Sequence, residues 1–388
     1  MPASAPTLMD MLRGLIGTPS VSSVSPQFDQ GNRAVIDLLA GWLEDLGFAV
    51  EIQPLDIHPD KANLIATLGR GGGGLVLAGH TDTVPCDPEL WRSDPFRLTE
   101  RDQRLYGLGT SDMKSFLALA IEAARRFDAG RLREPLTIVA TADEESSMAG
   151  ALALVEAGRA LGRHAIIGEP TGLRPIRTHK GIMMEAIRIR GQSGHSSDPA
   201  LGNSALEGMY QALGEILAWR AELQERHRNP LFKVPVPTLN LGHIHGGDNP
   251  NRICGACELH IDLRPLPGMD LDELRGELEK RLSRRLAGSG LGLQVERLFA
   301  GTPAMETPAG APIVQAGERL TGHPAEAVAF GTEGPYFNEL GMDTLILGPG
   351  DIEQAHQPDE YLRLDRIDPT LDLLERMIGE FCVTRAAP

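Results

Sequence analysis

The sequence carries histidine and acidic residues at the ends of predicted strands and helices. Side chains of these types are common ligands of divalent metal ions. The residues are His80, Asp112, Glu144, Glu145, Glu169 and His356. Each is a weak signal alone, because a histidine after a strand is more often structural and a glutamate pair is usually solvated. Active sites of open α/β sheets lie outside the carboxyl ends of strands, so such a set favours one shared site. Carboxylates and imidazoles bind zinc outside thiolate sites, and a shared aspartate can bridge two ions roughly 3.5–4 Å apart.

The first half of the chain alternates between strand and helix patterns, which predicts a sheet covered by helices. Strands are predicted at residues 48–52, 62–68, 75–78, 136–141 and 165–167, and helices at 34–46, 113–127 and 148–161. His80, the glutamate pair and Glu169 each follow one of these strands. Asp112 directly precedes a helix.

The middle of the chain has a strand–helix–strand–strand–helix–strand pattern, typical of a ferredoxin-like α+β fold. Its segments are residues 181–190, 203–226, 238–244, 257–263, 271–286 and 291–298. The end returns to the first style, with helices at 313–320 and 369–381 and a strand at 344–347. We therefore predict an α/β catalytic domain (1–180 and 300–388) interrupted by an inserted domain (181–299). Its sheet is expected to be mixed, largely parallel and covered by helices on both faces.

Composition narrows the class of protein. The 37 basic and 53 acidic residues give a net charge of −16, which argues against nucleic acid or an anionic membrane as a partner and fits a small cationic or zwitterionic substrate. Residues 1–16 have no secretory signal pattern, and no apolar run reaches the ~18 residues of a membrane span. Four cysteines are too few for a disulfide framework, so we expect a cytoplasmic protein with reduced thiols.

Three segments carry a specific resemblance. Residues 79–85 read GHTDTVP, residues 107–114 read GLGTSDMK, and Glu144 is followed by Glu145. These segments resemble the signatures of the dinuclear zinc peptidase and deacylase family. The resemblance extends over nearly the whole chain. Within that family, segments 251–268 and 347–361 are most similar to members that remove the acetyl group from N2-acetyl-L-ornithine in arginine biosynthesis.

The resemblance implies a ligand set for two zinc ions per subunit, with Co²⁺ as an alternative metal. His80 and Glu169 would hold one ion, and Glu145 and His356 the other. Asp112 would bridge them. Such ions would activate a water molecule and polarise the acyl oxygen of an amide.

The resemblance also implies three supporting roles. Glu144 would be the general base, taking a proton from the water and delivering it to the leaving amine. Asp82 would accept the free ring N–H of His80 and fix its tautomer. His195 would donate to the developing oxyanion, although it lies in the inserted domain. It must therefore arrive by domain closure or from a second subunit, and the resemblance favours a homodimer formed through the inserted domain.

Four further residues are candidates for contact with the substrate. Arg264 looks like the arginine that receives the substrate α-carboxylate, for which a guanidinium fork is suited. Asn251 and Arg252 are candidates for the same pocket. Glu333 is a candidate for contact with a cationic substrate side chain, and a turn-capping or exposed glutamate is the alternative.

Several features of the sequence bear on other interpretations. Cys254 and Cys257 form a C-x-x-C pair without a second pair, which favours free thiols over a redox or zinc motif. No G-x-S-x-G segment is present, which argues against a serine hydrolase. Another N-acyl amino acid hydrolase, such as a succinyl-diaminopimelate desuccinylase, remains the rival enzyme. A non-catalytic amino acid or peptide-binding protein is the rival from another class.

Overall fold

The central strands of the first structural unit are apolar because both of their faces are covered. β3 (Leu75–His80), β6 (Leu136–Thr141) and β7 (His164–Ile167) are buried at every position. The parallel strands β6, β3, β7 and β15 (Asp343–Ile346) lie side by side in that order. Antiparallel β1 (Ala49–Pro54) and β2 (Ala62–Leu68) continue the sheet beyond β6. The predicted α/β class with a mixed, largely parallel sheet is confirmed.

The computed structural model describes residues 6–56 and 58–383 and divides the chain into two units. The first unit contains the residues up to Arg177, Thr307–Glu326, and the residues from Thr332 onward. The second contains Thr178–Glu306 and Ala327–Gly331. The second unit thus extends a few residues beyond the predicted range at both ends and includes a short return segment that the sequence pattern did not indicate.

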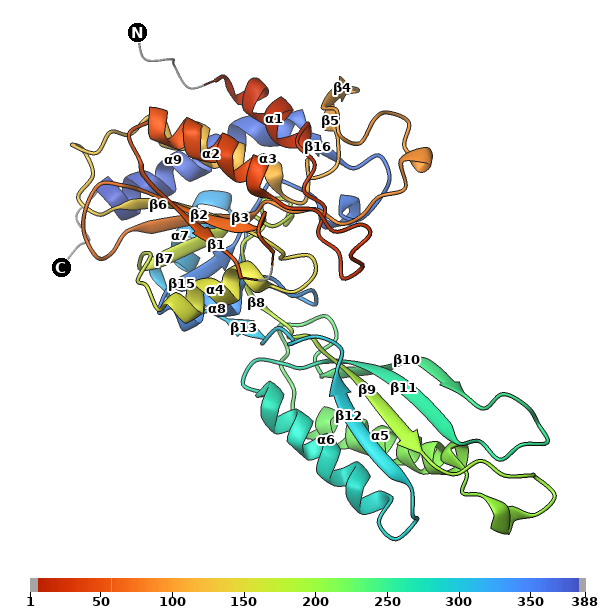
Figure 1. Cartoon of the computed structure of the whole chain (residues 1–388). Coiled ribbons are helices and arrows are strands. Elements are labelled where there is room, and N and C mark those ends of the chain that lie inside the picture. The colour runs from red at the N-terminus through yellow and green to blue at the C-terminus, as the bar shows by residue number, and fades with distance from the viewer. Residues whose placement is uncertain (1–5, 57, 384–388) are drawn as a thin grey trace. The chain divides into compact units, whose positions relative to one another are not determined.

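Helices cover both faces of the first unit's sheet (Figure 1). One face carries α1 (Leu8–Ile16), α2 (Arg33–Asp45), α3 (Lys114–Ala124) and α9 (Ile367–Ile378). The other carries α4 (Ala149–Ala157) and α8 (Gly334–Glu339). α7 (Pro312–Thr321) lies on the same face as α9, which it contacts. Local sequence sets the ends of α7: proline occupies its first position and Gly322 ends it in the left-handed conformation (φ 73°).

Short elements complete the first unit and the boundaries between the units. β4 (Thr99–Arg101), β5 (Arg104–Tyr106) and β16 (Tyr361–Arg363) form a small separate sheet. β8 (Ile176–His179), β13 (Met305–Glu306) and β14 (Glu326–Val328) lie where the chain passes from one unit to the other. Single 3₁₀ turns occur at Pro88–Leu90, Pro199–Leu201, Ile352–Gln354 and Leu364–Arg366, and a π-helical turn occurs at Gly379–Val383.

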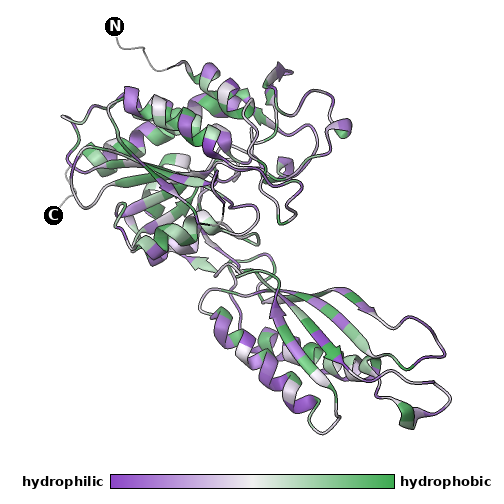
Figure 2. Ribbon diagram, viewed as in Figure 1, coloured by the Kyte–Doolittle hydropathy of each residue, from purple (hydrophilic) through white to green (hydrophobic). Residues whose placement is uncertain are grey.

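The second unit is a four-stranded antiparallel sheet in the order β10-β11-β9-β12 with two helices. Its strands are β9 (Met183–Arg190), β10 (Thr238–Gly246), β11 (Ala256–Arg264) and β12 (Gly292–Arg297), and its helices are α5 (Ala205–Arg226) and α6 (Leu271–Arg285). Hydrophobic and hydrophilic residues alternate along these strands (Figure 2), because one face packs on the helices around the fully buried Trp219. No helix among the residues described is long and apolar enough to cross a membrane.

Candidate metal centre

His80 ends β3 and is fully buried. Its Nδ1 lies 3.0 Å from the backbone oxygen of Asp82, so this nitrogen carries the proton. The opposite nitrogen, Nε2, is left with its lone pair and points at two carboxylates. It lies 3.2 Å from Asp112 Oδ1 and 4.0 Å from Glu169 Oε2. This tautomer is the one that a metal-binding Nε2 requires.

His356 faces the other oxygen of the same aspartate. Its Nε2 lies 3.6 Å from Asp112 Oδ2 and 3.1 Å from Glu145 Oε2. Asp112 therefore presents one oxygen to each histidine, as a carboxylate that bridges two ions must. His356 has a φ of 59°, which an L-residue rarely adopts, and its side chain is 54% exposed.

The five predicted ligands are brought together in two overlapping sets that share Asp112. One set is His80, Asp112 and Glu169, which are all buried, and the other is Asp112, Glu145 and His356. Within each set the ligand atoms lie within 4.8 Å of one another. A third set joins His80 to Glu144 and Glu145, so Glu144 lies close enough to reach a bound ion or its ligands.

The electrostatics of these residues fit a pair of cations. Burial, and then repulsion by a neighbouring carboxylate, raises the pKa of Glu144, Glu145 and Glu169. The hydrogen bond with Glu145 raises the pKa of His356 to about 9. One oxygen of Glu169 is buried with no hydrogen-bond partner among the residues described. Divalent ions would supply that missing partner and neutralise the crowded negative charge.

The loop that carries Asp112 is held by a buried carboxylate that sequence reasoning missed. Glu360 accepts the backbone N–H groups of Gly109 (3.0 Å), Ser111 (2.7 Å) and Asp112 (2.9 Å). Burial, which outweighs these hydrogen bonds, raises the pKa of Glu360 to about 8. Its place four residues after His356 was the only available signal. One short segment thus carries the predicted ligand His356 and fixes the aspartate that is predicted to bridge the ions.

Comparison with known proteins identifies the family. The model of Peptidase family M20/M25/M40 matches residues 76–380. The chain belongs to this family. The acetylornithine deacetylase of Edwardsiella ictaluri (strain 93-146) is 53% identical over 382 residues, which cover 98% of this chain and 100% of that protein. The sequence-based family assignment is confirmed.

Two solved structures share the fold of this family member. Aminopeptidase PepT from Bacillus cereus ATCC 10987 is 20% identical with a TM-score of 0.74, covering 96% of this chain and 98% of that chain. The Bacillus subtilis YXEP protein, described as a dinuclear metal binding peptidase from the M20 family, is 16% identical with a TM-score of 0.67. That likeness covers 96% of this chain and 97% of that chain.

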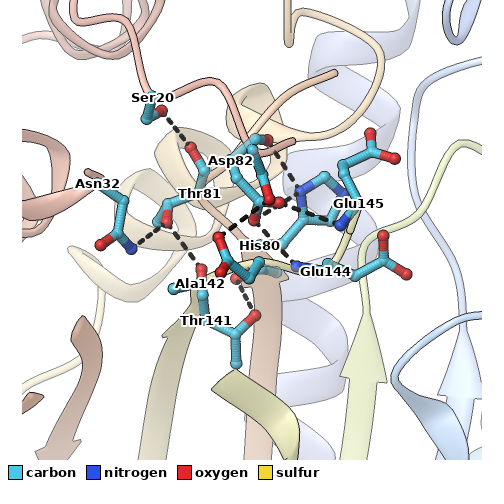
Figure 3. Close-up of polar contacts among 12 residues, drawn as sticks. Ser20, Asn32, His80, Thr81, Asp82, Thr141, Ala142, Glu144 and Glu145 are labelled. Carbon is cyan, nitrogen blue, oxygen red and sulfur yellow. Dashed lines mark hydrogen bonds and ion pairs between the residues drawn. The ribbon is translucent and has the colours of Figure 1, made fainter. Parts of the chain in front are cut away.

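The predicted contact of Asp82 in this family member is wrong in detail. Its carboxylate lies 3.7 Å from the His80 ring, which is beyond hydrogen-bonding distance, and the ring N–H goes to the Asp82 backbone oxygen. The carboxylate instead accepts the backbone N–H groups of Glu144 (3.3 Å) and Glu145 (3.1 Å), as Figure 3 shows. Asp82 therefore links the loop carrying His80 to the loop carrying the glutamate pair.

Glu333 also differs from its prediction. The side chain is completely buried, and Thr141 Oγ1 donates to it at 2.8 Å. Burial raises its pKa to about 7. It sits at the start of α8 without capping the helix through its side chain. In this structure Glu333 is therefore neither exposed to a substrate nor a turn cap.

The remaining predicted residues lie in the second unit. The Ser197 backbone N–H donates to His195 Nδ1 (3.2 Å), so a neutral His195 carries its proton on Nε2 and can donate from there. Asn251 and Arg252 lie beside the His195 loop. Ser196 N–H donates to Asn251 O (3.0 Å), and His195 and Arg252 form an isolated antiparallel β-bridge through their backbones.

Arg264 lies elsewhere in the same unit. It ends β11, whereas Asn251 and Arg252 precede the start of that strand. The nine residues of β11 span roughly 27 Å, so a pocket shared by these three residues would need Arg264 from one chain and the other two from another. Arg264 Nε donates to both oxygens of Asp262, at 2.9 and 3.1 Å, which orients the guanidinium plane.

Proposed function

We propose that this chain hydrolyses the acetyl amide of N2-acetyl-L-ornithine to L-ornithine and acetate, a reaction of arginine biosynthesis. The geometric observation that carries the proposal is Asp112, which turns one oxygen to His80 and the other to His356. The substrate is supported by the relative named acetylornithine deacetylase, which is 53% identical over 98% of the chain. We propose zinc as the metal, two ions per subunit, with Co²⁺ as an alternative.

The donor set supports this chemistry. When bound, two divalent ions supply Lewis acidity to the acyl oxygen and to the attacking water. Glu144 follows the end of β6 beside this ligand set, and its backbone is fixed by Asp82. Glu144 has no metal-binding role in the predicted ligand set, so its carboxylate is available as a general base. Glu144 takes the proton of the water and returns it to the amine that leaves.

His195 and Arg264 have proposed roles toward the substrate. The Nε2–H of His195 would donate to the oxyanion, and Arg264 would receive the α-carboxylate. Because the two residues lie at opposite ends of the second unit's sheet, a single substrate would meet them from two different subunits. The chemistry of this unit therefore supports a dimeric active site.

We propose that the dimer forms through the second unit of each chain. One side of α5 leaves Leu206, Tyr210 and Leu217 exposed, with 78% of Tyr210 accessible, and strand β10 lies at the sheet edge with Ile244 52% exposed. Exposed apolar stripes and open strand edges are common at protein interfaces. Light scattering should give the mass of a dimer for the wild type, and Tyr210→Glu should shift it toward that of a monomer. A monomeric wild type would contradict the proposal.

Steady-state kinetics test the reaction itself. The zinc-loaded protein is assayed with N2-acetylornithine, other N-acetyl amino acids and an N-succinyl amino acid. We expect the highest kcat/KM for N2-acetylornithine, loss of activity after chelation and recovery with Zn²⁺ or Co²⁺. A higher kcat/KM for the succinyl substrate would favour the desuccinylase. Substrate binding without turnover would favour the binding protein.

A further inference from the structure

Lys61 is a buried cation that the proposed reaction does not use. It directly precedes β2, and only 3% of it is exposed. Its Nζ lies 2.8 Å from each oxygen of Asp29 and 2.7 Å from Asp143 Oδ1. An ion buried in this way needs its partners, because removal of one partner leaves the other charge uncompensated. Lys61 therefore binds two segments of the chain together strongly.

The first of these segments leads directly to the metal centre. Asp143 immediately precedes Glu144 and Glu145, and its φ of 59° turns the chain sharply after β6. Non-glycine residues keep such a conformation only where surrounding contacts impose it. Here the Asp143 side chain is bound by Lys61 and by the Ser22 hydroxyl (3.0 Å). These contacts fix the starting point and direction of the glutamate pair.

The second segment reaches the loop that follows His80. Asp29 accepts the backbone N–H of Ser23 at 3.0 Å, next to the serine that contacts Asp143. The same segment donates from Ser20 Oγ to Thr81 O (2.6 Å, Figure 3) and from Ser22 N–H to Thr83 O (2.9 Å). Lys61 thus connects residues 20–29, which hold the loop after His80, to the loop that carries the glutamate pair.

We propose that Lys61 is a positioning residue for the metal ligand Glu145 and the base Glu144, acting through Asp143. Loss of a group that hydrogen-bonds to a metal ligand typically changes metal affinity or activity by 10–100-fold, and Lys61, which contacts Asp143 and not a ligand, should give an effect at the lower end of that range. We expect the larger effect at the set of Asp112, Glu145 and His356, because Lys61 pairs with the residue next to the glutamate pair, whereas it reaches the loop after His80 only through Asp29 and the serines near it. The kinetic part of this inference rests on the proposed function, and the metal-binding part does not.

The test is titration of the metal-free, full-length protein with Co²⁺, followed by the visible absorption of the bound ion. Lys61→Met removes the charge at similar length, and Lys61→Arg retains it. Lys180→Met is the matched control, because Lys180 is also 2% exposed but belongs to the second unit, where its Nζ donates to Val236 O. We expect Lys61→Met to weaken one of two Co²⁺ sites by about 10-fold, Lys61→Arg to restore part of it, and Lys180→Met to leave both unchanged.

A His356→Ala background identifies the affected site, because it leaves the ligand set around His80. There, Lys61→Met should change the affinity for the remaining Co²⁺ by less than about threefold. Equal losses at both sites, or none at either, would overturn the inference. If Lys61→Met does not fold, Ser22→Ala removes the hydroxyl contacts with Asp143 and Ser146 and must weaken the same site for the inference to stand. A wild type without deacetylase activity would refute the proposed function but leave these titrations valid.

Discussion

The sharpest test of the site is Glu144→Gln, which keeps the size of the side chain and removes its basicity. General acid–base catalysis contributes roughly 10²–10⁴-fold to rates. We take the middle of this range, because Glu144 lies beside the predicted ligand set and its backbone is held by Asp82. We expect kcat to fall about 10³-fold, equivalent to about 4 kcal/mol in the activation barrier, with KM changed little.

The assay pairs kinetics with metal analysis, and the next residue supplies the control. Glu145→Gln removes a carboxylate that belongs to the ligand set of His356. We therefore expect Glu145→Gln to lose both activity and one metal ion. Glu144→Gln should lose activity while retaining both ions. The contrast between two adjacent glutamates separates a base from a ligand under identical conditions.

Two results would refute this reasoning. If Glu144→Gln also loses an ion, Glu144 is a ligand, and the third set of neighbouring donors, with His80 and Glu145, describes the true coordination. If Glu144→Gln retains wild-type kcat, another group accepts the proton of the water. In either case the base would have to be sought elsewhere.

Three further predictions follow from the same contacts. Asp82→Asn should lower metal affinity about 10–100-fold in a titration, because its amide cannot accept both N–H groups of the glutamate loop; unchanged affinity would count against that contact. Gly168→Ala should lower the free energy of unfolding in urea by about 3 kcal/mol, because the new Cβ would lie 1.9 Å from a ring carbon of Phe116. Gly41→Ala, at an open position in α2, should raise it by about 1 kcal/mol. The metal-free protein should lose thermal stability as pH rises from about 5 to 9. The folded pKa values of Glu333 (about 7) and His356 (about 9) exceed their unfolded values, so the folded state binds extra protons that are lost as the pH passes those folded values. A Tm that rises over this range would contradict the shifts.

The elements that sequence predicts best are strands made mostly of apolar residues. β2 and β6 were predicted to the residue, because nearly every position of each is buried. The small sheet of β4, β5 and β16 was missed, because three-residue strands with polar side chains show no periodicity. α8 was missed for a similar reason, since a six-residue helix that begins with glycine and proline reads as a turn.

The residues that sequence identifies best are the ones that face the metal centre. Each candidate ligand follows a strand or lies in a short recognisable segment, and the structure gathers all five. The supports behind them were invisible, because they act across long sequence separations. Lys61 lies 82 residues from Asp143, and Glu360 lies 248 residues from Asp112. One usable signal existed: a lysine directly before a mostly apolar strand has to be paired when the strand is buried.

The two ligand sets differ in how the fold holds them, and this difference explains why support residues matter at one set. His80 ends β3 and Glu169 follows the adjacent parallel strand β7, so the sheet itself fixes their spacing. Glu145 and His356 come from loops, and His356 is exposed and in a strained conformation. Loops gain precision only from contacts outside the sheet. The hydrogen bonds of Asp82 and the ion pairs of Lys61 supply that precision where the proposed base also lies.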